Sequence, residues 1–566
     1  MKSNLIFSTV IFICWLLFAT ICSGYDWDLG YTILEIDLRT FWEKISFPTW
    51  SYQYCGGISR SGDVNSIAES PWFVLPVAFG AFWGYKLIAP LAFAVSIFYL
   101  NDFLMRYLNY TRKESYLFSG LFSLNSFWIM HVVHGHAGYS SQLLFIASML
   151  HYFLFLKGGV TRDLFSGAVL LFSSVTLGFY HVGTYMGLPT AMGVIVALFI
   201  LIVSGRISEI NRRRVIQIML CSLTAIVIYL PKILKSLNYQ RAMPRSIETT
   251  IDESYKVFDF FISLFVPPVG PMRLLNGIRS SGKWAAHEYS YFSFLNLFVV
   301  MMISVILFKL LKPENRRTLK TWKPSLGFTL ASCITVFSII FYFGNFASFS
   351  PFGLLNKYVF NSSHRVSTRY LLVGLFFLNL GSFSYFLKTK HKLTMRLGII
   401  GLLLGGVIPL TVITSEPKYL EKSKSDLTIQ LEHENHFIDK MKYVVFTTQG
   451  YPAESYRLIS NNFAVLNCYS PLRREIKLNS KFFKGLLKLY TPYFFFSHAD
   501  GEEINENSTC YMESYFTQTE ITISEQCPNE ILLRLLDLNP RASLGNYSAK
   551  ITEDGILLYK NGKSHE

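Results

Sequence analysis

Polar side chains suited to acid–base and phosphate chemistry stand where the long apolar blocks of this chain begin or end. They are Asp26 and Asp28 after the first block, His134 and His136 after another, His181 after a third, His287 and Glu288 before a later one, and Arg365 and Arg369 before one further on. A carboxylate can take the proton of an attacking hydroxyl, and a guanidinium binds phosphate through two parallel contacts. The set therefore indicates a site for a phosphate-bearing substrate.

Each of these residues also has a plain structural interpretation. Arginine at the end of a membrane helix often extends its head group to the interface. A single histidine at a helix end is more often structural than catalytic, and aspartate after a helix can form a turn or cap the next helix. The recurrence of such groups at the ends of several blocks, on one side of the expected bundle, favours the site.

The elements that must position these groups are membrane helices. The chain has 566 residues, of which 51% are hydrophobic and only 16% charged, and its apolar residues form blocks of the roughly 20 residues that span a bilayer. We predict an α-helical polytopic membrane protein of about eleven spans, which begin and end near residues 5–22, 84–104, 116–132, 140–156, 165–182, 190–203, 215–230, 292–310, 326–343, 370–386 and 397–414.

Charge predicts how these spans are oriented. The net charge is +15, and the basic residues gather in alternate loops, namely Arg106–Lys113, Lys157–Arg162, Arg206–Arg214, Lys309–Lys323 and Lys388–Arg396. The positive-inside rule places these loops in the cytoplasm, so the excess charge is not read as nucleic-acid binding. The first block then serves as an uncleaved helix with a cytoplasmic N-terminus. Residues 24–83, 231–291, 344–369 and the tail face outward.

The segment after residue 415 is polar, with short apolar runs that favour strands and helical pieces between them. We expect residues 1–415 to form the transmembrane domain and residues 416–566 an extracytoplasmic α+β domain, in which Cys510 and Cys527 are candidates for a disulfide. Within residues 24–83, the apolar spacing from Gly30 to Ile45 predicts an amphipathic helix at the membrane surface.

Several motifs at these positions resemble the GT-C superfamily of membrane glycosyltransferases, in particular its YfhO-like branch. They are the acidic pair after the first block, FPTWSYQYCGG leading to ESPWFVLP, the GH of HVVHGH, HEYSYFSFLNL and HRVSTRYL. The resemblance covers most of residues 5–414. It implies transfer of a sugar from a polyprenyl-phosphate donor to a glycan, lipid or protein at the outer face of a bacterial inner membrane.

The resemblance also implies roles for the site residues. Asp28, or Asp26, acts as the base or binds the acceptor; His136, Arg365 and Arg369 contact the donor phosphate, with His134 beside them. Glu288, with His287, binds the sugar or a metal. The turn after His136 lacks the second acidic motif of many members, so a site with Mg²⁺ or Mn²⁺ and a metal-free site both stay open.

Two other functions remain as alternatives. A transporter or flippase of a lipid-linked saccharide is one, although few charges lie inside the blocks, where transporters usually place them. A non-catalytic membrane scaffold whose tail binds a partner is the other.

Overall fold

A computed structural model gives the fold. It describes residues 2–22, 26–45, 47, 50–51, 58–59, 66–206, 208, 210–242, 257–266, 290–311, 325–347, 349–358 and 367–415, together with strands between 444 and 560. The chain divides into two compact units, each of which is described by itself. Unit 1 comprises Met1–Ser23, Val64–Arg241 and Ile247–Leu420, and unit 2 comprises Gly24–Asp63, Ala242–Ser246 and Glu421–Glu566.

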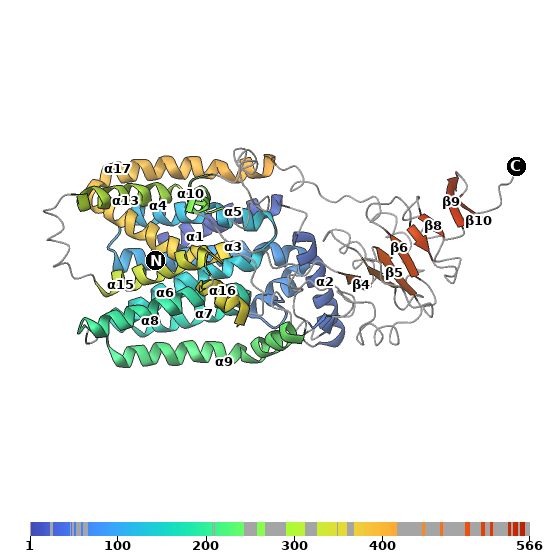
Figure 1. Cartoon of the computed structure of the whole chain (residues 1–566), viewed down its shortest axis with the longest axis horizontal. Coiled ribbons are helices and arrows are strands. Elements are labelled where there is room, and N and C mark those ends of the chain that lie inside the picture. The colour runs from blue at the N-terminus through green and yellow to red at the C-terminus, as the bar shows by residue number, and fades with distance from the viewer. Residues whose placement is uncertain are drawn as a thin grey trace. The chain divides into compact units, whose positions relative to one another are not determined.

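Unit 1 is a helical bundle (Figure 1). Its elements are α1 (Lys2–Ile21), η1 (Pro71–Phe73), α3 (Val74–Tyr107), α4 (Arg112–Ser123), α5 (Ser126–Val133), η2 (Ala137–Ser140), α6 (Ser141–Gly158), α7 (Thr161–Tyr180), the π-helix η3 (His181–Gly187), α8 (Leu188–Val203), α9 (Arg212–Ala242), α10 (Val257–Phe265), α13 (Leu295–Leu311), α15 (Leu326–Tyr342), α16 (Pro351–Tyr358), η6 (Ser367–Tyr370) and α17 (Leu371–Ser415).

The chain is an integral membrane protein with several apolar spans, but the expected count of eleven is not reproduced. Within the described residues, seven helices are long and apolar enough to cross a bilayer, or eight if the bent pair α4 and α5 is one span. Two further apolar helices, Leu295–Phe308 and Leu326–Tyr342, are shorter. The last two expected spans both lie on α17, in which the backbone leaves helical geometry only at Lys390, so the basic run expected to be a loop is helical around that break.

Exposed apolar side chains mark the faces of unit 1 that suit lipid. On α8 they include Ile195, Phe199 and Val203, and on α9 Met219 and Ile228 are more than 60% exposed. In water so large an apolar surface would drive aggregation, whereas in a bilayer it carries no penalty. These two helices therefore belong at the lipid-facing side of the bundle.

The first helix packs into the bundle rather than standing apart from it. Trp15 stacks on Phe93 of α3 at 4.2 Å, and the buried Lys86 of α3 donates a hydrogen bond to the carbonyl of Ala19 at 2.6 Å and another to that of Cys22. These carbonyls lie at the C-terminal end of α1, where helical backbone has no partner of its own and carries partial negative charge. Lys86 thus fixes the point at which the chain leaves α1.

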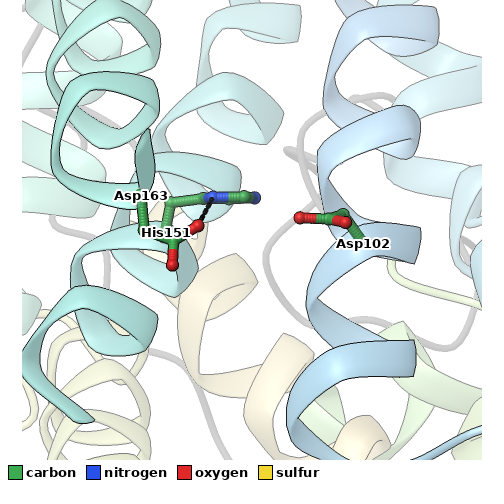
Figure 2. A group of neighbouring side chains, drawn as sticks. All are labelled: Asp102, His151 and Asp163. Carbon is green, nitrogen blue, oxygen red and sulfur yellow. Dashed lines mark ion pairs between the residues drawn. The ribbon is translucent and has the colours of Figure 1, made fainter. Parts of the chain in front are cut away.

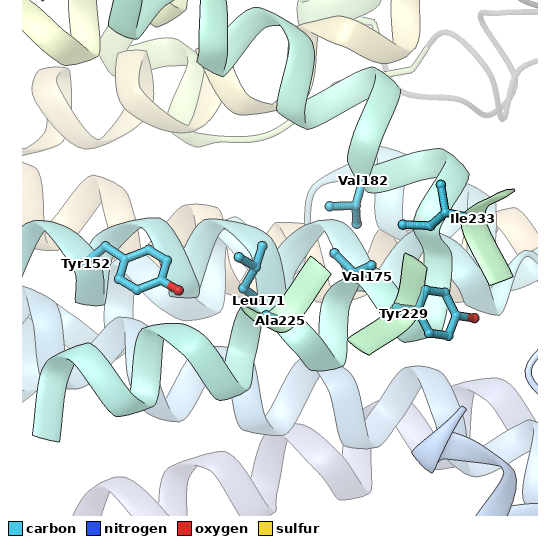
Figure 3. Close-up of a cluster of buried hydrophobic side chains, with 7 residues drawn as sticks. All are labelled: Tyr152, Leu171, Val175, Val182, Ala225, Tyr229 and Ile233. Atoms are coloured by element: carbon cyan, nitrogen blue, oxygen red, sulfur yellow. The ribbon is translucent and has the colours of Figure 1, made fainter. Parts of the chain in front are cut away.

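Polar and apolar contacts together join the helices of the interior. The buried side-chain oxygen of Asn101 on α3 accepts hydrogen bonds from Ser115 and Ser119 of α4, both at 2.6 Å. Elsewhere a cluster of buried hydrophobic side chains joins α6, α7, η3 and α9, as Figure 3 shows; its members are Tyr152, Leu171, Val175, Val182, Ala225, Tyr229 and Ile233. This cluster packs the exposed helix α9 against the bundle.

Unit 2 contains α2 (Asp26–Lys44), the antiparallel pair β1 (Trp50–Ser51) and β2 (Ile58–Ser59), and a mixed sheet in the order β10-β9-β8-β7-β6-β5-β3-β4. Its strands are β3 (Val444–Thr447), β4 (Ala464–Asn467), β5 (Tyr493–Ser497), β6 (Tyr511–Ser514), β7 (Ile521–Ile523), β8 (Ala542–Leu544), β9 (Tyr547–Thr552) and β10 (Gly555–Lys560). The expected helical pieces, Cys510 and Cys527 lie outside the described residues, so the α+β domain stays a prediction.

The contact between α8 and α15 allows a first test. A Cβ atom added to Gly193 would lie 2.6 Å from the Cα of Ile334, so Gly193→Ala must push α15 away. Overpacking of this kind costs about 1–3 kcal/mol. We expect a matching loss of stability in thermal unfolding of the detergent-purified protein.

Gly406→Ala on α17 is the matched control, because nothing lies within 4 Å of its added Cβ. Alanine favours helix by up to about 1 kcal/mol over glycine, so this variant should be as stable as the parent or slightly more so. Equal stability of the two variants would contradict the close packing of α8 on α15.

Candidate functional site

Arg369 is held between two tyrosine rings at one end of the bundle. Its Nη1 donates a hydrogen bond to the hydroxyl oxygen of Tyr185 at 3.2 Å. Its Cζ lies 5.2 Å from the ring centroid of Tyr139 and 5.4 Å from that of Tyr185, within the range of cation–π attraction. The arginine is half-buried, while both tyrosines are buried. The guanidinium is therefore oriented by protein and still accessible.

Three histidines surround Tyr139. Its ring stacks on His131 at 3.7 Å between centroids and packs on His181 at 4.0 Å, and the ring of His136 lies 5.6 Å away. His131 and His136 share a hydrogen bond between their Nδ1 atoms at 3.0 Å, so one of the two nitrogens carries the proton. We call His131, His136, Tyr139, His181, Tyr185 and Arg369 the histidine–tyrosine cluster.

The turn between α5 and α6 positions the first part of the cluster. Asn125 caps α5 by accepting a hydrogen bond from the backbone of Phe127 at 2.9 Å, and Gly135 turns the chain with a φ of +83°, which side chains disfavour. The hydroxyl of Tyr85 on α3 donates to the carbonyl of Gly135 at 2.7 Å. His134 Nδ1 donates to the carbonyl of Met130 at 2.8 Å. The turn is therefore held from several sides, and His134 is part of its support.

A break at the end of α7 brings His181 to Tyr139. Gly178 has non-helical backbone angles, and a Cβ there would lie 2.7 Å from the carbonyl oxygen of Gly138, so only glycine allows this approach. The chain continues as η3, one of the π-helical segments that frequently occur at functional sites. Because Tyr185 follows His181 by four residues, both reach the same cluster.

The short helix η6 is fixed firmly, and Arg369 with it. Tyr291 donates its hydroxyl to the carbonyl of Thr368 at 2.7 Å, and Ser367 donates to the carbonyl of Tyr342 at 3.0 Å. Tyr370 is buried against Phe341, Tyr185 and Phe352. The ring of Tyr291 also stacks on Phe127, which packs against His131. One continuous set of contacts therefore connects Arg369 to the histidines.

The cluster suits the binding of an anion. A guanidinium offers paired donors in a plane that matches phosphate oxygens, and an imidazole can add a donor or carry a proton. His136, His181 and Arg369 are only half-buried, whereas the tyrosines and His131 behind them are buried. The partly exposed polar groups of His136, His181 and Arg369 therefore rest on buried aromatic side chains.

The structure brings together only some of the residues expected from the sequence. His136 and Arg369 meet at Tyr139, and His134 lies beside His136, with 6.1 Å between the ring centroids. Asp26 and Asp28 belong to the first turn of α2, which begins at Asp26 rather than near Gly30. This helix is part of unit 2. The side chains of both aspartates lie outside the described residues. His287, Glu288 and Arg365 also lie outside the described residues.

Sequence reasoning missed three members of the cluster, His131, Tyr139 and Tyr185. His131 opens the motif HVVHGH and precedes His134 by three residues, a spacing that places both on one helix face, so the motif itself held the signal. The two tyrosines resemble ordinary interior aromatic residues of membrane helices and gave no such signal.

A second polar group lies where α3, α6 and α7 meet, at the end of these helices away from the histidine–tyrosine cluster. Asp102, His151 and Asp163 offer ligand atoms that all lie within 4.8 Å of one another, and Figure 2 shows His151 between the two carboxylates. The sequence left a metal-dependent and a metal-free site both open, with Glu288 as a ligand of the sugar or of a metal, and Glu288 lies outside the described residues. Among the described residues, this Asp/His/Asp group is the one arrangement with metal-ligand spacing.

No protein-family model matches the chain, and no curated protein matches it. Several solved structures of membrane glycosyltransferases match the chain at low sequence identity. The oligosaccharyltransferase of Archaeoglobus fulgidus matches with a TM-score of 0.47 and 11% identity over 82% of this chain, which spans 64% of that protein. ArnT of Cupriavidus metallidurans, bound to undecaprenyl phosphate, matches with a TM-score of 0.44 and 14% identity over 99% of this chain and 98% of its own.

A third match is the archaeal oligosaccharyltransferase AglB of A. fulgidus in complex with an inhibitory peptide and a dolichol-phosphate. It has a TM-score of 0.44 and 11% identity, over 89% of this chain and 69% of AglB. At such scores and identities we transfer no residue roles or substrates from these structures.

The anchoring of η6 gives a testable prediction. Tyr291→Phe removes the donor to Thr368 while keeping the ring on Phe127, so it should lower the free energy of unfolding by about 0.5–1.5 kcal/mol. The measurement is thermal or denaturant unfolding in detergent. Tyr107→Phe is the control, because the Tyr107 hydroxyl makes no hydrogen bond to the described part of the chain; it should stay within about 0.5 kcal/mol of the parent. A Tyr291 variant as stable as this control would contradict the anchoring.

Proposed function

We propose that this protein is a membrane glycosyltransferase that moves a sugar from a polyprenyl-phosphate donor to a glycan, lipid or protein acceptor at the outer face of the membrane. The observation that carries the proposal is the fixed guanidinium of Arg369, supported by two tyrosine rings beside His136 and His181 at a bundle end. The phosphate of a lipid-linked donor is an anion that lies at the membrane surface, where a site at the end of the bundle can bind it. Assignment to the YfhO-like branch rests on the quoted motifs alone.

In the proposed reaction, Arg369 and the half-buried histidines bind the donor phosphate and stabilise the charge that grows on it as the sugar leaves. The acceptor hydroxyl attacks the anomeric carbon and gives its proton to Asp28, or to Asp26. A new bond forms between the acceptor oxygen and the sugar, the bond from the sugar to the phosphate oxygen breaks, and the lipid phosphate leaves. Arg365 adds a second phosphate contact, while Glu288 and His287 bind the sugar.

The distribution of basic residues supports the outward placement of the cluster. His181 directly follows α7, whereas Arg162 and Asp163 stand in its first turn. At that opposite end, Arg106 and Arg162 pair with aspartates, and Arg214 donates to the carbonyls of Leu156 and Lys157. The positive-inside rule assigns the basic end to the cytoplasm, so we place the cluster on the outside, with a cytoplasmic N-terminus and an extracytoplasmic tail.

The aspartates provide the direct test of catalysis. In a deletion strain of the native host, Asp28→Asn should lower transfer by about 100-fold or more, the usual contribution of a general base, and Asp26→Asn should have a smaller effect. The measurement is mass spectrometry of envelope glycans and lipid-linked sugars after complementation at matched protein levels. The expected signature is accumulation of the donor lipid and loss of the modified product.

Glu35→Gln, on the same helix α2, is the matched control and should complement within about twofold. Full complementation by both asparagine variants would remove the catalytic model. A deletion strain in which the lipid-linked saccharide stays on the inner leaflet, instead of accumulating on the outer one, would favour the flippase.

A further inference from the structure

The group of Asp102, His151 and Asp163 lies at the end of the bundle away from the histidine–tyrosine cluster. Asp163 stands in the first turn of α7 and His181 follows its last residue, so the two sites are about 27 Å apart along that helix at 1.5 Å per residue. His151 comes from α6 and Asp102 from the last third of α3. The group thus joins three helices and plays no part in the proposed transfer.

The hydrogen bonding of His151 leaves one ring nitrogen aimed into the group. Its side chain is fully buried, and its Nε2 lies 3.2 Å from the carbonyl of Tyr99. A carbonyl only accepts, so Nε2 carries the proton. The Nδ1 lone pair then faces Oδ1 of Asp163 at 3.6 Å, too far for a hydrogen bond, and among the described residues it has no hydrogen-bond partner.

This spacing is close to that of two ligands on one metal ion. Bonds of about 2.0–2.2 Å from zinc to nitrogen or oxygen, at tetrahedral angles, separate neighbouring ligand atoms by roughly 3.4 Å. Oδ1 of Asp163 already accepts a hydrogen bond from Arg106, whereas Nδ1 of His151 faces this second acceptor without a donor, and a cation shared by the two atoms would satisfy it. The distances therefore fit a shared cation better than direct contact.

We propose that Asp102, His151 and Asp163 form a binding site for one divalent transition-metal ion of the zinc class. An imidazole nitrogen favours such ions over Mg²⁺ and Ca²⁺, which prefer oxygen ligands. Three protein ligands leave the fourth position for water. The side chain of Asp102 is about one-fifth exposed, which gives the ion an entry path. The bound ion ties α3, α6 and α7 together.

Arg106 is the competitor that this proposal must overcome. Its guanidinium makes two hydrogen bonds to the carboxylate of Asp163, at 2.6 and 2.8 Å, and contacts Asp102 at 3.0 Å. Arg162 also donates to Asp102. Two guanidiniums already balance two carboxylates, so a metal enters only by displacing Arg106. That side chain is one-third exposed and can turn outward into water.

This competition gives a test that separates a metal site from a simple ion-pair network. The full-length protein, purified in detergent and treated with chelator, is titrated with Co²⁺, the visible absorption of which reports nitrogen and oxygen ligation. We expect one Co²⁺ per chain, competed by Zn²⁺. Arg106→Gln should bind at least about tenfold more tightly, because the competing cation is gone.

Removing a ligand should have the opposite effect. Asp102→Asn and His151→Gln should each weaken Co²⁺ binding by about 10-fold to 100-fold, while His391→Gln, an exposed histidine that pairs with Glu114, should bind as the parent does. If the buried His151 variant fails to fold, Asp102→Asn and Arg106→Gln decide the question. Arg106→Gln without tighter binding, or Asp102→Asn with unchanged binding, would overturn the proposal.

Discussion

The contact of one guanidinium with two tyrosine rings is the interaction on which the candidate site depends. Each cation–π contact contributes about 0.5–2 kcal/mol, so two such contacts favour one orientation of the guanidinium over an arginine that extends freely to the interface. Tyr139 and Tyr185 come from different elements, η2 and η3, and Arg369 from a third, η6. Arg369 therefore bridges three short helices that lie far apart in the sequence.

That constraint explains several irregular features of the backbone. The non-helical Gly178, the π-helix that follows it and the positive φ of Gly135 all lie beside the cluster. Each costs some helical stability, and each places one imidazole or phenol within ring contact of Tyr139 or Arg369. The backbone departs from ideal helix at the end that carries the histidine–tyrosine cluster, whereas α6 and α7 are regular elsewhere. This distribution is consistent with a binding site at the ends of the helices.

The sequence predicted the bundle well because long apolar runs have few alternatives in a membrane. All eleven predicted blocks overlap helices of the described chain, and only the separation into spans differed. Lys388–Arg396 has the composition of a cytoplasmic loop, yet both arms of α17 continue through it with a single break at Lys390. The basic composition of a segment indicates on which side of the membrane it lies, but it does not indicate whether the segment is a loop or a helix.

The sites were harder to predict, for a different reason. Histidines and arginines at block ends were visible because they interrupt apolar sequence, but Tyr139 and Tyr185 look like packing residues until their neighbours are known. Asp102, His151 and Asp163 come from three helices and have no characteristic spacing along the chain. Only the packing of α3, α6 and α7 places them together, and no motif encodes that packing.

The most direct measurement is the affinity of the protein in lipid nanodiscs for undecaprenyl phosphate, used as a probe of the donor phosphate and quantified by native mass spectrometry. Loss of a charge-assisted hydrogen bond costs about 1.5–3 kcal/mol, so Arg369→Gln should weaken binding by about 10-fold to 100-fold. Arg396→Gln, which removes an exposed arginine on α17, should leave it unchanged. Equal affinity of the two variants would contradict the account.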